Sequence, residues 1–138
     1  SLAGIKMLNL ENEVKEVFTT EQMLPAIGQG VIALQCKKDD KKILDTIKMI
    51  NDKETYHCIK AERALLEAIG GDCDTAIGGL AKLSNQKIFL KCELFSNDMT
   101  KKFEFENSGD FKDAQEIGYV SGKELLKKAG SNFTTQGN

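Results

Sequence analysis

The stretch AIGGDCDTAIGG, residues 68–79, places Cys73 between two aspartates, with a pair of glycines on either side. A buried structural cysteine is expected inside an apolar run, and a rapid thiolate nucleophile is expected beside lysine, arginine or a protonated histidine. Asp72 and Asp74 instead disfavour the thiolate. Cys73 therefore fits neither role, and its chemistry has to be sought in the rest of the chain.

The 19 basic residues include a single arginine, Arg63, and the net charge is -2. Arginine is the preferred partner of carboxylates and phosphates because its guanidinium donates two parallel hydrogen bonds. One arginine is too few for a polycarboxylate pocket, and this net charge argues against a broad nucleic-acid surface. Arg63 is either a solvent-facing helix residue, paired with Glu62, Glu67 or another acid, or a residue that its helix face, shared with Ile59 and Leu66, directs toward a cleft.

The other cysteines, Cys36, Cys58 and Cys92, fall on apolar segments, which predicts core packing and leaves Cys73 as the one expected to be readily alkylated. The adjacent His57 and Cys58 are unlike the closely paired ligands of structural zinc sites, so no metal is predicted. No apolar run approaches the roughly 20 residues of a membrane helix, and the start lacks a signal-peptide pattern. We therefore expect free thiols in a reducing compartment, the cytoplasm, and no membrane partner.

Residues from 51 to about 130 have the pattern of an α+β domain. Apolar periodicity predicts a helix over about 53–69, capped by Asn51 or Asp52 and stopped by Gly70. Strands and a final helix are predicted at 76–83, 87–95, 100–106 and about 111–129. The expected fold is a three-stranded antiparallel sheet with flanking helices.

The first 50 residues do not close into a domain of their own. Pro25 and the neighbouring glycines interrupt regular structure, and residues 43–50 have helical spacing. The apolar run VIALQC, 31–36, is typical of a buried strand and needs partners on both sides. We therefore expect the first half of the chain to be mobile, or to bury 31–36 against a second copy of the chain.

Three motifs carry a resemblance to a known family. They are MLPAIGQGVIALQC, AERALLEAIGGDCDTAIGGLA and DAQEIGYVSGKELLKKAG, in this order. Together they resemble the C-terminal part of porphobilinogen deaminase, also called hydroxymethylbilane synthase, over about residues 2–130. The resemblance implies that 1–24 end domain 2, that 25–50 form the hinge and the return segment of domain 1, and that 51–138 form the cofactor-carrying domain 3. Remnants of two α/β domains would thus precede the C-terminal domain.

The same resemblance implies a function and site residues. The family condenses four porphobilinogens head to tail into hydroxymethylbilane, with release of ammonia, on a dipyrromethane cofactor held by a thioether to the cysteine at Cys73. Arg63 would bind cofactor or substrate carboxylates, Gly71 would allow close approach of a flat pyrrole, and Gln29 would be either a turn residue or a contact at the active-site hinge. The family's catalytic aspartate has no counterpart here, so this chain alone is expected to be inactive, and whether it carries the cofactor stays open.

This chain departs from the family pattern beside the cysteine. Asp72 stands where many members have glycine or serine, and Ala76 where proline is common. The alternative is a non-catalytic α+β binding module with an exposed thiol, and a pyrrole adduct on Cys73 would distinguish the two. A redox thiol protein is disfavoured because no second cysteine lies near Cys73. The full enzyme is expected to be monomeric.

Overall fold

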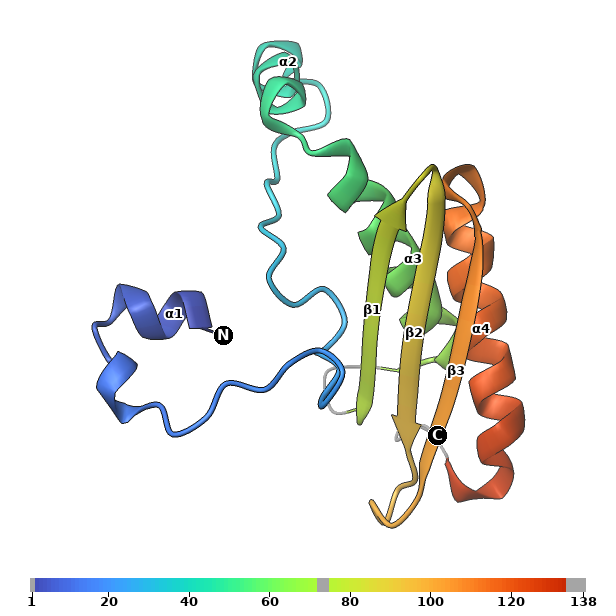
Figure 1. Cartoon of the computed structure of the whole chain (residues 1–138). Helices are drawn as coiled ribbons and strands as arrows, with labels where there is room; N and C mark the ends of the chain where they lie inside the picture. The colour runs from blue at the N-terminus through green and yellow to red at the C-terminus, as the bar shows by residue number, and fades with distance from the viewer. Residues whose placement is uncertain (1, 72–74, 134–138) are drawn as a thin grey trace.

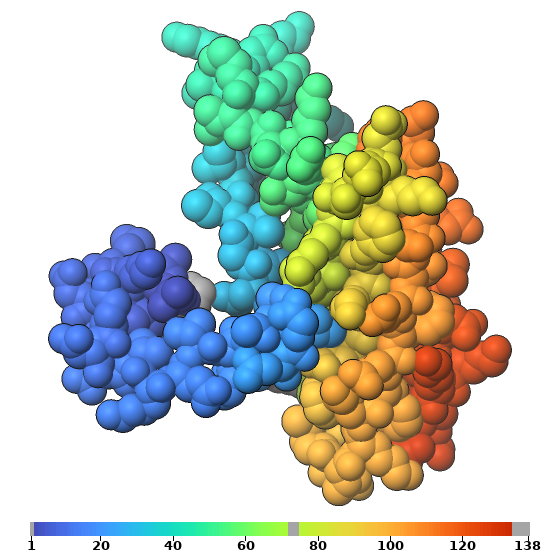
Figure 2. All heavy atoms as spheres, viewed as in Figure 1, coloured from blue at the N-terminus to red at the C-terminus, as the bar shows by residue number. Residues whose placement is uncertain are grey.

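The computed structural model describes residues 2–71 and 75–133, which form a helix-backed sheet preceded by a long N-terminal arm (Figure 1). We call residues 53–133 the α+β unit and residues 2–50 the N-terminal arm. In the space-filling view the start of the arm projects away from the unit (Figure 2). Within the described residues, no helix is long and apolar enough to cross a bilayer.

The sheet consists of β1 (Ile77–Ser84), β2 (Lys87–Phe95) and β3 (Lys102–Asp110), antiparallel in the order β1-β2-β3. The turn between β1 and β2 has Asn85 at φ 49° and Gln86 at φ 61°. Two successive left-handed residues define the tight hairpin turn whose twist matches that of the strands. The prediction of a three-stranded antiparallel sheet is confirmed.

Two helices cover one face of this sheet: α3 (Lys53–Ile69) and α4 (Ala114–Ala129), the latter preceded by a short 3-10 turn (Figure 1). α3 begins where the Asp52 carboxylate accepts a hydrogen bond from the Thr55 N–H at 2.6 Å, so Asp52 rather than Asn51 is the cap. It ends at Gly70, whose φ of 71° is left-handed. These helix boundaries follow the prediction closely.

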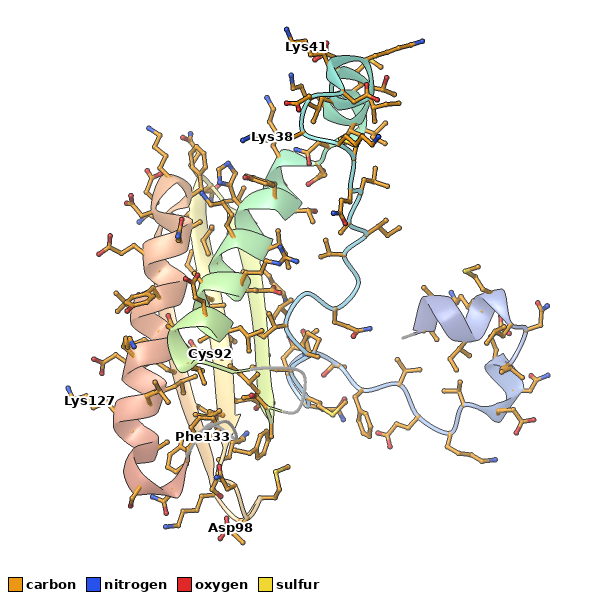
Figure 3. The ribbon with its side chains drawn as sticks, turned by 180° about the vertical axis from the view of Figure 1, so that it is seen from behind. Lys38, Lys41, Cys92, Asp98, Lys127 and Phe133 are labelled. Atoms are coloured by element: carbon orange, nitrogen blue, oxygen red, sulfur yellow. The ribbon has the colours of Figure 1, made fainter. Side chains whose placement is uncertain are left out.

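The core lies between the two helices and the sheet. Alternate residues of β2 are buried, among them Cys92, which Figure 3 labels where the helices overlie the sheet. The fully buried side chains include Leu65 of α3, Leu94 of β2 and Leu125 of α4. Because each such leucine contributes about 1.5–3 kcal/mol when buried, the α+β unit carries the stability of the fold.

The arm contains α1 (Leu2–Met7), a 3-10 turn and α2 (Lys41–Ile50), and none of residues 2–50 is fully buried. The predicted helix over 43–50 is confirmed by α2. The predicted strand at 31–36 is wrong: the segment has no regular structure, and Ile32 is 89% exposed. A strand needs a hydrogen-bonded neighbour, and in the described part of the chain β1 offers none because its free edge is occupied by other groups. The prediction that Cys36 packs in the core is also wrong, because this residue is only partly buried.

Candidate functional site

The predicted site residues lie around α3 and the two loops that touch it. Cys73 itself lies outside the described residues, as do its neighbours Asp72 and Asp74. Arg63, Gln29 and Gly71 are described, and the geometry around α3 relates the three to one another.

One face of α3 runs from the arm to the end of the helix. Ile59, Arg63 and Leu66 share this face because they are spaced by four and three residues. The Ile59 Cδ1 atom lies 3.3 Å from the position that a Cβ on Gly28 would occupy. At the other end, the Leu66 Cδ1 atom lies 2.9 Å from the corresponding position on Gly71. Arg63 is therefore placed between the loop that carries Gln29 and the loop that leads to residue 73.

Arg63 is exposed, and no ion pair within the described residues involves it. The pairing with Glu62 or Glu67 considered from the sequence is therefore not observed. Glu62 is buried and bound elsewhere, whereas Glu67 is exposed on the same helix. An exposed guanidinium of this kind can bind a carboxylate with two parallel hydrogen bonds.

Gln29 stands in a turn between two left-handed glycines, Gly28 at φ 73° and Gly30 at φ 82°. Its N–H donates to the Ala26 carbonyl oxygen at 3.0 Å, and the residue is exposed. The role as a turn residue is thus observed. The exposed side chain is compatible with the second role, as a hinge contact, which stays a prediction.

Gly71 is needed for the local backbone. Its N–H donates to the Leu66 carbonyl oxygen at 3.2 Å, which completes the end of α3. A Cβ at this position would lie 2.9 Å from both Leu66 Cδ1 and Thr75 Oγ1. The amide of Gly71 is therefore already used, and the space beside its Cα is filled by Leu66 and Thr75.

Glu62 is the residue that the sequence reasoning missed. It is only 6% exposed, and its carboxylate accepts hydrogen bonds from the N–H of Gly28 and the N–H of Ala81, both at 2.9 Å. Burial raises the pKa of Glu62, and the two amide hydrogen bonds oppose that rise. The signal in the sequence was its position four residues after Cys58, at the margin of the apolar stripe of the helix.

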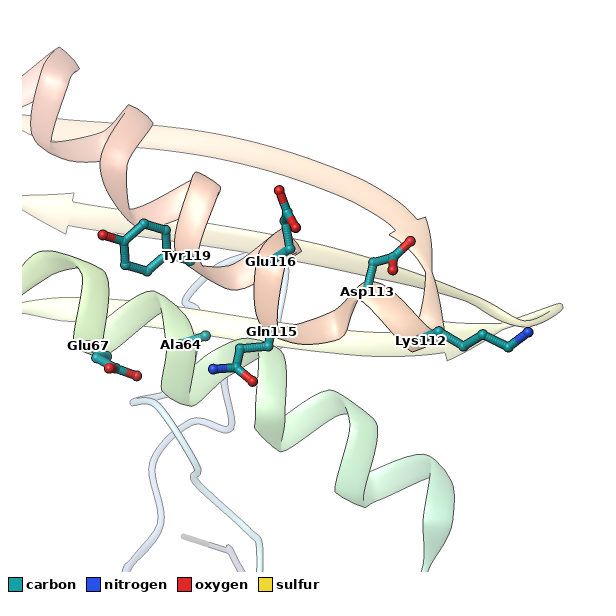
Figure 4. Close-up of a pocket in the computed structure, with 7 residues that line it drawn as sticks. All are labelled: Ala64, Glu67, Lys112, Asp113, Gln115, Glu116 and Tyr119. Carbon is teal, nitrogen blue, oxygen red and sulfur yellow. The ribbon is translucent and has the colours of Figure 1, made fainter.

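A shallow hollow lies between α3 and the start of α4, away from the predicted site (Figure 4). Its lining includes Glu67, Lys112 and Tyr119, and it contains none of the predicted site residues. In the part of the chain that the structure describes, no group of three His, Cys, Asp or Glu side chains is arranged to hold a metal ion.

The family comparisons agree with this architecture. The model described as "Porphobilinogen deaminase, C-terminal domain" matches residues 56–127, and the one described as "Porphobilinogen deaminase, dipyromethane cofactor binding domain" matches residues 1–45. The chain therefore belongs to the porphobilinogen deaminase family, and its α+β fold is that expected for the C-terminal domain.

Curated relatives extend the match over nearly the whole chain. Porphobilinogen deaminase of Nitrobacter hamburgensis is 35% identical over 135 residues, which is 98% of this chain and 43% of the relative. The Coxiella burnetii (strain Dugway 5J108-111) protein is 35% identical over 95% of this chain, and the Prochlorococcus marinus protein 36% identical over 91%. The chain thus spans about 43% of the length of the first of these relatives.

Proposed function

We propose that this chain is part of a porphobilinogen deaminase, which condenses four porphobilinogens head to tail into hydroxymethylbilane and releases ammonia. The observation that carries the proposal is the 35% identity to a protein of that name over 98% of the chain. We place the enzyme in the cytoplasm, where reducing conditions keep thiols free; Cys36, Cys58 and Cys92 are free in the structure.

The cofactor in this proposal is a dipyrromethane bound to Cys73 through a thioether. Such a group supplies a permanent anchor to which pyrrole units are added. The family domain that matches residues 1–45 is named for this cofactor. The two aspartates beside Cys73 disfavour its thiolate, which suits a single attachment better than repeated nucleophilic attack.

Arg63, Gln29 and Gly71 would bind or accommodate this cofactor. The exposed guanidinium of Arg63 lies on the α3 face that extends from Gly28 to Gly71, and this placement supports a role in binding pyrrole carboxylates. Gly71 would let a flat ring approach the backbone. Gln29 would contribute a polar contact from the hinge. No catalytic residue is assigned to this chain.

We divide the chain into the end of domain 2 at 1–24, the hinge and part of domain 1 at 25–50, and domain 3 at 51–138. The contrast in burial supports this division. None of residues 2–50 is fully buried, whereas the whole hydrophobic core of the described residues comes from the α+β unit. In this division, the apolar segment 31–36 would be buried by parts of domain 1 that lie outside this chain.

The test is a turnover assay on two proteins. The 138-residue chain alone is expected to give no tetrapyrrole from porphobilinogen, because one arginine cannot hold a product with many carboxylates. A chimera in which this chain replaces the matching segment of the Nitrobacter hamburgensis enzyme is expected to be active. Intact mass should then show two pyrrole units on the chimera.

Two cysteine variants of the chimera are the matched controls. Cys73→Ser should lose both the pyrrole adduct and the activity, while Cys36→Ser should keep both. A folded chimera without any pyrrole adduct, or an adduct that survives Cys73→Ser, would contradict the proposal. Tetrapyrrole synthesis by the 138-residue chain alone would show that the assignment of an inactive part is wrong.

The full enzyme is proposed to be a monomer, whereas this chain should self-associate through residues 31–36. Val31, Ile32 and Leu34 are exposed to 38, 89 and 56%, and burying them against a second copy would be favourable. Ile32→Lys combined with Leu34→Lys should lower the weight-average mass in sedimentation experiments. Met49→Lys, at an exposed apolar residue of α2, should not. A wild-type chain that stays monomeric at all accessible concentrations would refute this prediction.

A further inference from the structure

The free edge of β1 is closed by groups from other parts of the chain. In an antiparallel edge strand, the N–H of every second residue points away from the sheet. The Gly79 N–H donates to the Pro25 carbonyl oxygen at 2.9 Å, and the Ala81 N–H donates to Glu62 Oε1 at 2.9 Å. The edge is therefore covered partly by α3 and partly by residues 24–28, which we call the crossing segment.

Glu62, a residue of α3, connects the edge of β1 to the crossing segment. Its Oε1 atom accepts from Ala81 in β1, and its Oε2 atom accepts from Gly28 at the end of the crossing segment. The carboxylate lies at 6% exposure, so both hydrogen bonds are shielded from water. One side chain of α3 therefore holds the sheet edge and the arm together.

Two adjacent glycines make room for the crossing segment on both faces of β1. A Cβ on Gly78 would lie 3.0 Å from the Leu24 Cβ, and a Cβ on Gly79 would lie 2.5 Å from the Ile27 Cδ1 atom. Ala26 pairs with Gly78 in an isolated antiparallel bridge. The crossing segment thus straddles the strand edge, with Leu24 on one face and Ile27 on the other.

We infer that ionised Glu62 is a latch that fixes the N-terminal arm to the α+β unit through the crossing segment. The inference goes beyond the proposed function, because it assigns a positioning role to a residue that the proposed function does not use. Its basis is the number of acceptors: two N–H donors face this side chain, and only a carboxylate presents two acceptor oxygens. A glutamine would turn its NH2 group toward one of the two donors.

Loss of the Glu62 carboxylate should release the arm rather than the sheet, because the two N–H donors, those of Ala81 and Gly28, differ in their surroundings. Ala81 is held in the sheet by the pairing of β1 with β2, whereas Gly28 is held to the unit through the edge contacts of the crossing segment. Glu62→Gln should therefore keep the bond to Ala81 and release Gly28. The Gly79–Pro25 hydrogen bond depends on the same segment, so it should weaken as well.

The test measures backbone amide exchange by NMR in the 138-residue chain. In Glu62→Gln, protection of the Gly28 and Gly79 amides should fall about tenfold or more, as expected for losing a hydrogen bond to a charged group. Protection of Leu90 and Leu94 in β2 should be unchanged. Glu67→Gln, at an exposed glutamate of the same helix, is the matched control and should alter none of these amides.

A second measurement decides the matter if Glu62→Gln fails to fold. In the wild-type chain, the Gly28 and Ala81 amide proton shifts should titrate together, with one midpoint above the ordinary glutamate value of 4.5. Among the described residues, the titratable group that faces Glu62 is the Cys58 thiol. Burial, and to a lesser extent Glu62, raises the pKa of this thiol. Cys58 therefore stays protonated over the pH range in which Glu62 titrates. Independent titration of the two amides would overturn the inference, as would unchanged Gly28 and Gly79 protection in a folded Glu62→Gln chain.

Discussion

Replacing Gly118 by alanine is expected to destabilise the fold by about 2 kcal/mol or more, because α3 and α4 touch there without room for a side chain. A Cβ on Gly118 would fall on the carbonyl oxygen of Ala61, which is backbone and cannot rotate away. Alanine would gain up to about 1 kcal/mol of helix propensity over glycine, but the two helices would have to separate. Chemical denaturation of the wild-type and variant chains measures the difference.

The matched control lies two residues along the same helix. Val120 is 41% exposed, so Val120→Ala removes little buried surface and should change the free energy of unfolding by less than about 0.5 kcal/mol. Gly122→Ala is a second probe of the same contact, since its Cβ would lie 2.8 Å from the Leu65 carbonyl oxygen. If Gly118→Ala were as stable as Val120→Ala, the close approach of α3 and α4 would be disproved.

The α+β unit could be predicted from the sequence because its signals are local. The stripe that carries Ala61, Leu65 and Ile69 fixed one helix, and a glycine in the left-handed conformation ended it at the predicted place. Alternation of apolar and charged residues around Phe103 and Phe105 predicted β3, and the structure places these two side chains against the core. In these segments, propensity, capping and periodicity favour the same structure.

Contacts between distant segments could not be predicted in the same way. The apolar run 31–36 has the composition of a buried strand, but no composition supplies the neighbour that a strand requires. Glycines 78 and 79 accommodate Leu24 and Ile27 in the structure, and no local pattern in the sequence announces that contact. Glu62 was missed because a charged residue on a helix is usually solvated, and its burial depends on amides from two distant segments.

The cysteines should differ in alkylation rate by orders of magnitude, with Cys92 the slowest. Cys92 is 2% exposed, its thiol donates to the Phe105 carbonyl oxygen at 3.2 Å, and burial raises its pKa to about 12. Compared with an ordinary thiol of pKa about 8.5, its thiolate fraction at pH 8 is lower by a factor of roughly 2000. Burial also raises the pKa of Cys58, so this thiol should react second slowest.

Cys36 changes the labelling pattern that the sequence predicts. Cys73 was expected to be the only cysteine readily alkylated, but Cys36 is partly exposed in an arm without a core, so we now expect it to react readily too. Limited alkylation of the native chain at pH 8, followed by peptide mass mapping, gives the four rates, with Cys36→Ser and Cys73→Ser as controls for assignment. As long as the pH stays below the pKa of Cys92, its labelling rate should increase about tenfold for each unit by which the pH is raised, because only the thiolate reacts. Cys92 reacting as fast as Cys36 would mean that the sheet and the helices open readily, which the buried core of the α+β unit does not allow.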